Sequence, residues 1–258
     1  MRENMRLCVG ISWLRRIVAV VALTAMVGLF VAPTVACFGA FGWLPRIQLV
    51  PAVAAGSGLV LVGIAVSVAL CGRLYCSTVC PLGILQDVFR GLVTLAPFRK
   101  AARRPLPRAL RIPPAALRAI RLAFLVLFLA SAFFGLFAVL APYGIFGRAA
   151  VSAADFSVTP VKVAALVQLA LILAATLWRG RFWCNTVCPV GTFLGLFSRF
   201  AVFRVRIDRT KCVNCNLCAR ACPNGCIPSA KEKTVDHSRC VSCLACAGVC
   251  GKGALTWR

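Results

Sequence analysis

Residues 72–89 read GRLYCSTVCPLGILQDVF, and residues 180–197 read GRFWCNTVCPVGTFLGLF. Nine of the eighteen aligned positions are identical, at a constant offset of 108 residues. The identities include two cysteines in the pattern Cys-x-x-x-Cys and the proline that follows the second cysteine. Internal self-similarity of this kind indicates a structural unit that occurs twice. We therefore expect two equivalent halves, each carrying one Cys-x-x-x-Cys-Pro element (residues 76–81 and 184–189).

The cysteines of these elements are Cys76 and Cys80 in the first and Cys184 and Cys188 in the second. A spacing of i, i+4 predicts that both sulfurs of an element lie on one face of a helix. The proline that follows can begin a new helix at its first turn. The four cysteines are candidates for a shared metal or cluster site, for redox-active thiols or for a docking element. Simple packing of small side chains is the structural alternative.

Long apolar stretches flank both elements. The chain is 61% hydrophobic and only 14% charged, whereas a soluble domain is roughly 45–50% apolar and about 25% charged. This composition excludes soluble globular and disordered proteins. Segments at about residues 17–36, 50–70, 122–141 and 161–178 suit the roughly 20 apolar residues that cross a bilayer. The sequence thus predicts an all-α protein with four transmembrane helices, built as two duplicated helical hairpins.

Basic residues indicate the orientation of these helices. The chain holds 30 Lys and Arg against 6 Asp and Glu, a formal net charge of +24. With the four helices as predicted, 27 of the 30 fall on one side. The positive-inside rule makes that side cytoplasmic, so we expect both termini in the cytoplasm and the protein in a bacterial inner membrane. A nucleic-acid partner would need a binding module, and none accompanies the charge. Membrane lipid is the expected neighbour.

Two further cysteine runs follow residue 205, and each has the pattern C-x2-C-x2-C-x3-C. In bacterial two-cluster ferredoxins, the fourth cysteine of each such run ligates the other cluster. The spacing therefore predicts two [4Fe–4S] clusters and two ligand sets. The first set is Cys212, Cys215, Cys218 and Cys250, and the second is Cys240, Cys243, Cys246 and Cys222. We expect a small cytoplasmic α+β ferredoxin domain over residues 201–258, after a membrane domain over residues 1–200.

Other redox cofactors lack their usual sequence signals. The chain has a single histidine, so paired haem ligands in the helices are excluded. It has neither a Cys-x-x-Cys-His haem attachment motif nor a glycine-rich nucleotide motif. We expect no haem and no nucleotide, and an electron source that is a quinol, a protein or another bound cofactor. Asp87, Asp155 and Gln168 are candidates for contacts with a quinol, but the sequence assigns no catalytic residue.

The four predicted helices, the doubled Cys-x-x-x-Cys-Pro element and the two cluster runs together resemble the NapH family. These are ferredoxin-type membrane quinol dehydrogenase subunits, with MauN proteins among their relatives. The resemblance implies an electron-transfer subunit that oxidises the quinol pool. Its electrons would pass toward a periplasmic reductase of the nitrate reductase type, through a periplasmic ferredoxin-like or cytochrome partner.

The related NosR and CcoG families share this core and carry additional domains. Their resemblance keeps a second function open, an accessory role in metalloenzyme maturation or metal reduction. A third alternative is an iron–sulfur redox sensor.

Overall fold

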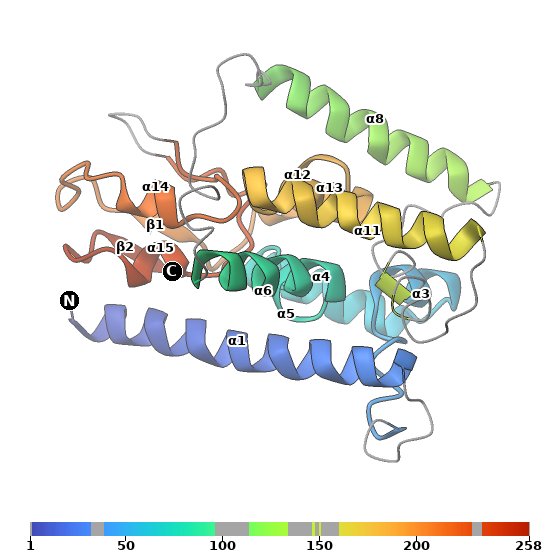
Figure 1. Cartoon of the computed structure of the whole chain (residues 1–258). Coiled ribbons are helices and arrows are strands. Elements are labelled where there is room, and N and C mark those ends of the chain that lie inside the picture. Colours follow the sequence, from blue (N-terminus) through green and yellow to red (C-terminus); the bar gives the residue numbers. More distant parts are fainter. Residues whose placement is uncertain are drawn as a thin grey trace.

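The structure is a computed structural model that describes residues 2–31, 39–95, 114–133, 146–147, 150, 160–228 and 234–257. These residues are mostly helical, as expected (Figure 1). The longer helices are α1 (Arg2–Val31), α4 (Gly58–Cys71), α6 (Pro81–Leu95), α8 (Pro114–Phe133), α11 (Pro160–Arg179) and α13 (Pro189–Ser198). The short elements are α3 (Leu49–Ala54), α5 (Tyr75–Thr78), α12 (Phe182–Thr186), α14 (Leu217–Ala221), α15 (Ala245–Gly248), β1 (Val205–Ile207) and β2 (Leu255–Trp257).

Three of the four predicted apolar segments fall on single helices. The segments at 17–36 and 122–141 overlap α1 and α8, which both begin earlier than expected, and residues 32–36 and 134–141 lie outside the described residues. The segment at 161–178 coincides with α11. The prediction of one helix over 50–70 is wrong, because α3 ends before Gly56. This glycine has a φ of +64°, a left-handed conformation that commonly terminates a helix.

One described helix, within Leu7–Val31 of α1, is long and apolar enough to cross a membrane. The apolar stretches Gly58–Cys71 and Val163–Leu177 are shorter. Figure 1 shows α1, α4, α8 and α11 extending along a common direction. The cysteine-rich carboxyl-terminal segment lies at one end of these helices, beside the amino terminus.

Small side chains on α1 allow it to pack closely in the core. Ala19, Ala22 and Ala25 are buried together with Met26 against Ile84 of α6. Each alanine adds little bulk, so the two helix backbones can approach one another. Through this face, α1 covers the helix that follows the first Cys-x-x-x-Cys-Pro element.

The first turns of α1 pack against the carboxyl-terminal segment instead. There β1 and β2 form a two-stranded antiparallel sheet in which Val205 pairs with Trp257 and Ile207 with Leu255. The side chain of Cys8 is buried in the same apolar cluster as Val205 and Leu255. A segment of this size has little apolar core of its own, and α1 supplies part of it.

Candidate functional site

The two Cys-x-x-x-Cys-Pro elements have the same local structure. The first cysteine lies in a short helix, α5 or α12, and Pro81 or Pro189 begins the next helix, as predicted. The prediction that both sulfurs share one helical face is wrong, because these short helices end at Thr78 and Thr186. The second cysteine instead precedes the next helix. In α13, the N-cap Cys188 accepts a 3.4 Å hydrogen bond at Sγ from the Gly191 N–H.

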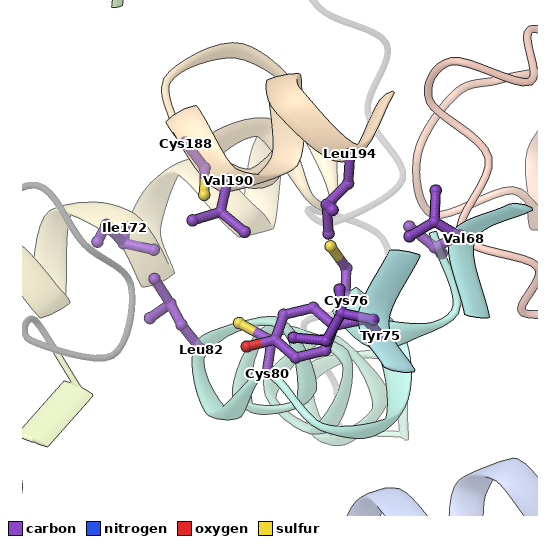
Figure 2. Packing of buried hydrophobic residues seen from close by; sticks show 11 residues of the cluster. Val68, Tyr75, Cys76, Cys80, Leu82, Ile172, Cys188, Val190 and Leu194 are labelled. Atoms are coloured by element: carbon purple, nitrogen blue, oxygen red, sulfur yellow. The ribbon is translucent and has the colours of Figure 1, made fainter. Parts of the chain in front are cut away.

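All four cysteines of the elements are buried, with 4–5% of each side chain exposed. Figure 2 shows the sulfurs of Cys76, Cys80 and Cys188 among the apolar side chains packed between the two halves. Burial raises the pKa of Cys80 to about 12 and that of Cys184 to about 11. At neutral pH these groups are therefore thiols. The structure brings the four residues into one interior, and their proposed chemistry stays a prediction.

Two arginines connect the halves reciprocally. Arg73, three residues before the first element, donates from Nη2 to the carbonyl of Cys184, at 3.0 Å. Arg181, three residues before the second, donates from Nη1 to the carbonyl of Cys76, at 2.9 Å. Both side chains are only 1% exposed. Each guanidinium thus satisfies a backbone carbonyl that the break before the second cysteine leaves without a helical partner.

Glycines make room for these contacts. A Cβ at Gly83 would lie 2.3 Å from the carbonyl oxygen of Cys76, and one at Gly191 would lie 2.3 Å from that of Cys184. Both glycines are among the nine identities of the repeat. The repeat therefore preserves a close backbone approach together with the arginine that fills the remaining space.

The two arginines differ in their counter-charges. Asp87 accepts from Nε of Arg181 at 2.7 Å and forms a second ion pair with Arg15, at 3.6 Å. Burial alone would raise the pKa of Asp87, but the charges of Arg181 and Arg15 and their hydrogen bonds outweigh it and lower the pKa. The candidate quinol contact Asp87 is thus an ion-pair partner. Gln168 is half-buried on α11, and Asp155 lies outside the described residues.

The second cluster-ligand set lies directly on both elements. Ser77 donates to the carbonyl of Val241 at 3.1 Å, and Asn185 donates to the carbonyl of Asn224 at 3.3 Å. Ser77 and Asn185 occupy equivalent positions of the repeat, each directly after the first cysteine. Val241 follows Cys240, and Asn224 lies two residues after Cys222. Both halves therefore hold the loops that carry these ligands.

The cysteine runs fit an iron–sulfur cluster by their backbone as well as by their donors. Asn214, Asn216, Ser242 and Leu244 have φ between +50° and +60°. They occupy the same two positions in each run, directly before and directly after its second cysteine. Alternating left-handed residues curl the chain so that successive N–H groups face inward, an arrangement found around many iron–sulfur sites.

A pocket in the structure coincides with the second ligand set. Its lining includes Cys222, Cys240, Cys243 and Cys246, together with Cys226. Hydrogen bonds from the side chain and backbone of Cys226 outweigh burial and lower the pKa of Cys222 to about 6, which favours the thiolate that iron binds. The first set is more open: Cys215 is exposed, Cys212 and Cys250 are half-buried, and Cys218 is buried.

Within the described residues, no three His, Cys, Asp or Glu side chains converge on a single metal-ion position. A [4Fe–4S] cluster takes one thiolate per iron. The cysteines around a cluster therefore lie farther apart than the ligands of a single metal ion.

Comparison with known families agrees with this chemistry. One family profile, described as a 4Fe-4S binding domain, matches residues 53–105 and 161–208. It spans both Cys-x-x-x-Cys-Pro elements. A second profile with the same description matches residues 205–227 and 233–256, which hold the cysteine runs. No solved structure matches the chain.

Several relatives share much of the sequence. The ferredoxin-type protein NapH of Escherichia coli (strain K12) is 34% identical over 178 residues, 67% of this chain and 55% of the relative. The methylamine utilization ferredoxin-type protein MauN of Paracoccus denitrificans (strain Pd 1222) is 32% identical over 159 residues, 59% of this chain and 48% of the relative. The chain is a homologue of the NapH and MauN ferredoxin-type proteins.

YccM of Escherichia coli (strain K12) is a further relative, 30% identical over 201 residues, 72% of this chain and 54% of that protein. The matches thus span about half the length of these relatives. The resemblance to NapH and MauN is confirmed, and the chain carries 4Fe-4S binding domains of the kind that these ferredoxin-type proteins share. The reciprocal arginines escaped prediction. Their only sequence signal is that Arg73 and Arg181 are among the identities of the repeat.

Proposed function

We propose that the chain is the quinol-oxidising subunit of a membrane-bound electron-transfer system. It would pass electrons toward a periplasmic reductase through a ferredoxin-like or cytochrome partner. The observation that carries this proposal is the seating of the second ligand set on both Cys-x-x-x-Cys-Pro elements, through Ser77 and Asn185. This arrangement joins the two cysteine-rich parts of the chain at one interface, where electrons could be exchanged over a short distance.

We propose two [4Fe–4S] clusters with the ligand sets described above, each of which supplies one-electron chemistry when bound. The residues of this chain prepare both sites. The left-handed residues orient the loops, and the Cys226 N–H donates to Sγ of Cys222 at 3.3 Å. Such hydrogen bonds stabilise the thiolate and tune the potential of the cluster that it binds.

Exposed apolar side chains support a membrane domain with four passes. They lie along α1, α4, α8 and α11, where a soluble protein would place polar residues. The most exposed on each helix are Leu14, Leu59, Val126 and Leu171. In the proposed orientation, these faces contact lipid, and the cluster-binding segment lies on the cytoplasmic side with both termini.

We propose that the four buried cysteines of the elements are redox-active thiols. Burial keeps Cys80, Cys184 and Cys188 protonated by raising their pKa. A disulfide between two of them would accept two electrons and two protons from a quinol and become a thiol pair. Its re-oxidation would release two protons and pass one electron to each of the two proposed clusters. Protons and electrons would therefore separate at this interior, with electrons leaving through the segment that covers it.

The test is anaerobic reduction of the purified full-length protein in lipid nanodiscs by a short-chain quinol. Electron paramagnetic resonance would report the reduced clusters. We expect quinol to reduce the clusters of the wild-type protein. In the Cys76→Ala and Cys184→Ala variants, we expect slower reduction of the clusters and an unchanged iron content. Clusters that dithionite reduces but quinol does not would contradict the proposal. The matched control is Cys71→Ala, outside both elements.

A further inference from the structure

Arg73 is a buried cation whose charge has no carboxylate partner among the described residues. Its side chain is 1% exposed. Nη1 donates to the side-chain oxygen of Asn185 and to the carbonyl of Ser238, both at 3.1 Å, and Nη2 donates to the carbonyl of Cys184. Nε is buried without a hydrogen-bond partner. All the acceptors of Arg73 are therefore neutral oxygens.

The equivalent arginine of the other half is neutralised. Arg181 pairs with Asp87, and the repeat places Gly195 at the position that corresponds to Asp87. A Cβ at Gly195 would lie 2.6 Å from the carbonyl oxygen of Ser238. The second half therefore has no carboxylate at this position of the repeat. The carbonyl of Ser238, in the loop before Cys240, lies beside Arg73 instead.

An arginine stays charged in a protein interior. Burial of an ion without an opposite charge is strongly unfavourable, so a nearby anion is needed to stabilise Arg73 in this place. Ser238, whose carbonyl accepts from Arg73, lies two residues before Cys240, so the buried charge lies against the loop that carries this proposed ligand. The carboxylate of Asp236, two residues before Ser238, is already paired with Arg239 at 2.6 Å, so the second ligand set with its cluster is our candidate for the missing anion.

We infer that Arg73 is the buried counter-charge of the cluster held by Cys222, Cys240, Cys243 and Cys246, and that it raises the reduction potential of this cluster above that of the other. The inference rests on the two clusters of the proposed function. Reduction adds negative charge, and a cation stabilises that charge more strongly in a low-dielectric interior than in water.

The other ligand set lacks such a setting. Cys215 is exposed, and Arg220, a cation of α14 within the same cysteine run, is exposed as well. Water and salt screen charges at such a surface. The two clusters therefore differ in potential although their ligand patterns are identical, and an electron at equilibrium resides on the cluster that faces the repeat.

A redox titration of the full-length protein, followed by electron paramagnetic resonance, tests this inference. In the Arg73→Gln variant, we expect the reduction equilibrium of one cluster to weaken by about tenfold or more, which is about 59 mV for one electron, and the other cluster to keep its potential. Arg73→Lys retains the charge and should show less than half of this shift. Arg220→Gln removes an exposed cation and is the matched control.

Each outcome is decisive. Unchanged potentials in Arg73→Gln, or an equal shift in Arg73→Lys, would overturn the role of Arg73. If Arg73→Gln does not retain both clusters, Arg73→Lys decides alone: wild-type loading and potential support the counter-charge, and loss of the cluster overturns it. Iron analysis separates the two proposals, because a wild-type chain with fewer than two clusters contradicts the proposed function itself.

Discussion

Arg73 and Arg181 occupy equivalent positions of the repeat, and each guanidinium donates to the carbonyl of the first cysteine in the opposite element. Each half thus places one buried guanidinium against the backbone of the other half. They lie between the short helices that carry Cys76 and Cys184. The reciprocal arrangement explains why the arginine of the repeat is retained beside the cysteines, and it predicts what its loss would do.

Replacement of Arg181 by methionine should lower the free energy of unfolding by about 1–3 kcal/mol, because the variant leaves the buried carbonyl of Cys76 without its donor and the half-buried Asp87 without its main partner. Denaturant unfolding in detergent, followed by tryptophan fluorescence, measures the change. Arg209→Met is the control, since Arg209 is exposed, and its effect should stay within about 0.5 kcal/mol. Equal effects of the two variants would contradict a stabilising role for the buried pair.

Alanine at Gly83 or Gly191 should disrupt the repeat, because the new Cβ would meet a backbone oxygen at 2.3 Å. We expect poor yield and early thermal unfolding of both variants. Gly91→Ala offers a control in the same helix as Gly83, where an added Cβ has nothing within 4 Å. That variant should be neutral or more stable by up to about 1 kcal/mol. If Gly83→Ala behaves like Gly91→Ala, the close backbone approach is wrong.

Acid should weaken the interface between α6 and the second element. The pKa of Asp87 is lowered in the folded protein, so its ion pairs stabilise the fold fully above the pKa of about 3.9 that an unfolded aspartate has. This contribution is lost as pH falls through the lower folded pKa. Thermal unfolding between pH 6 and pH 3 should show a smaller acid-dependent loss in Asp87→Asn than in wild type. An equal acid-dependent loss of stability in wild type and Asp87→Asn would contradict this role of the ion pairs.

Cysteine substitutions should separate ligands from neighbours. Cys243→Ala should remove about half of the bound iron, since it deletes one ligand of one of the two proposed clusters. Cys226→Ala should retain the iron, although Cys226 lines the same pocket. Iron and sulfide analysis after anaerobic purification gives the answer. Loss of iron in Cys226→Ala comparable to that in Cys243→Ala would make Cys226 a ligand.

Local patterns predicted the parts of this molecule that depend on neighbours in the chain. The prolines begin helices as expected, whereas the two ligand sets stay a prediction, with the four cysteines of the second set lining one pocket. The break at Gly56 was not predicted, because the apolar residues on both sides of the short sequence Gly56-Ser57-Gly58 read as one continuous span. The burial of Arg73 was also missed, since ten basic residues of the same predicted loop fit a solvated surface. Arg73 is buried because its acceptors on Cys184 and Asn185 belong to the other half of the repeat, which is 108 residues further along the chain.

The hydrogen bond from Ser12 to the carbonyl of Cys243, at 3.3 Å, joins residues 231 positions apart. Contacts of such separation form slowly, because the intervening chain must be ordered first. During synthesis, the first turns of α1 must therefore wait, with Cys8 uncovered, until the cysteine runs have left the ribosome. If Cys243 is a cluster ligand as proposed, its acquisition of iron and the final seating of α1 would belong to the same late step of biogenesis.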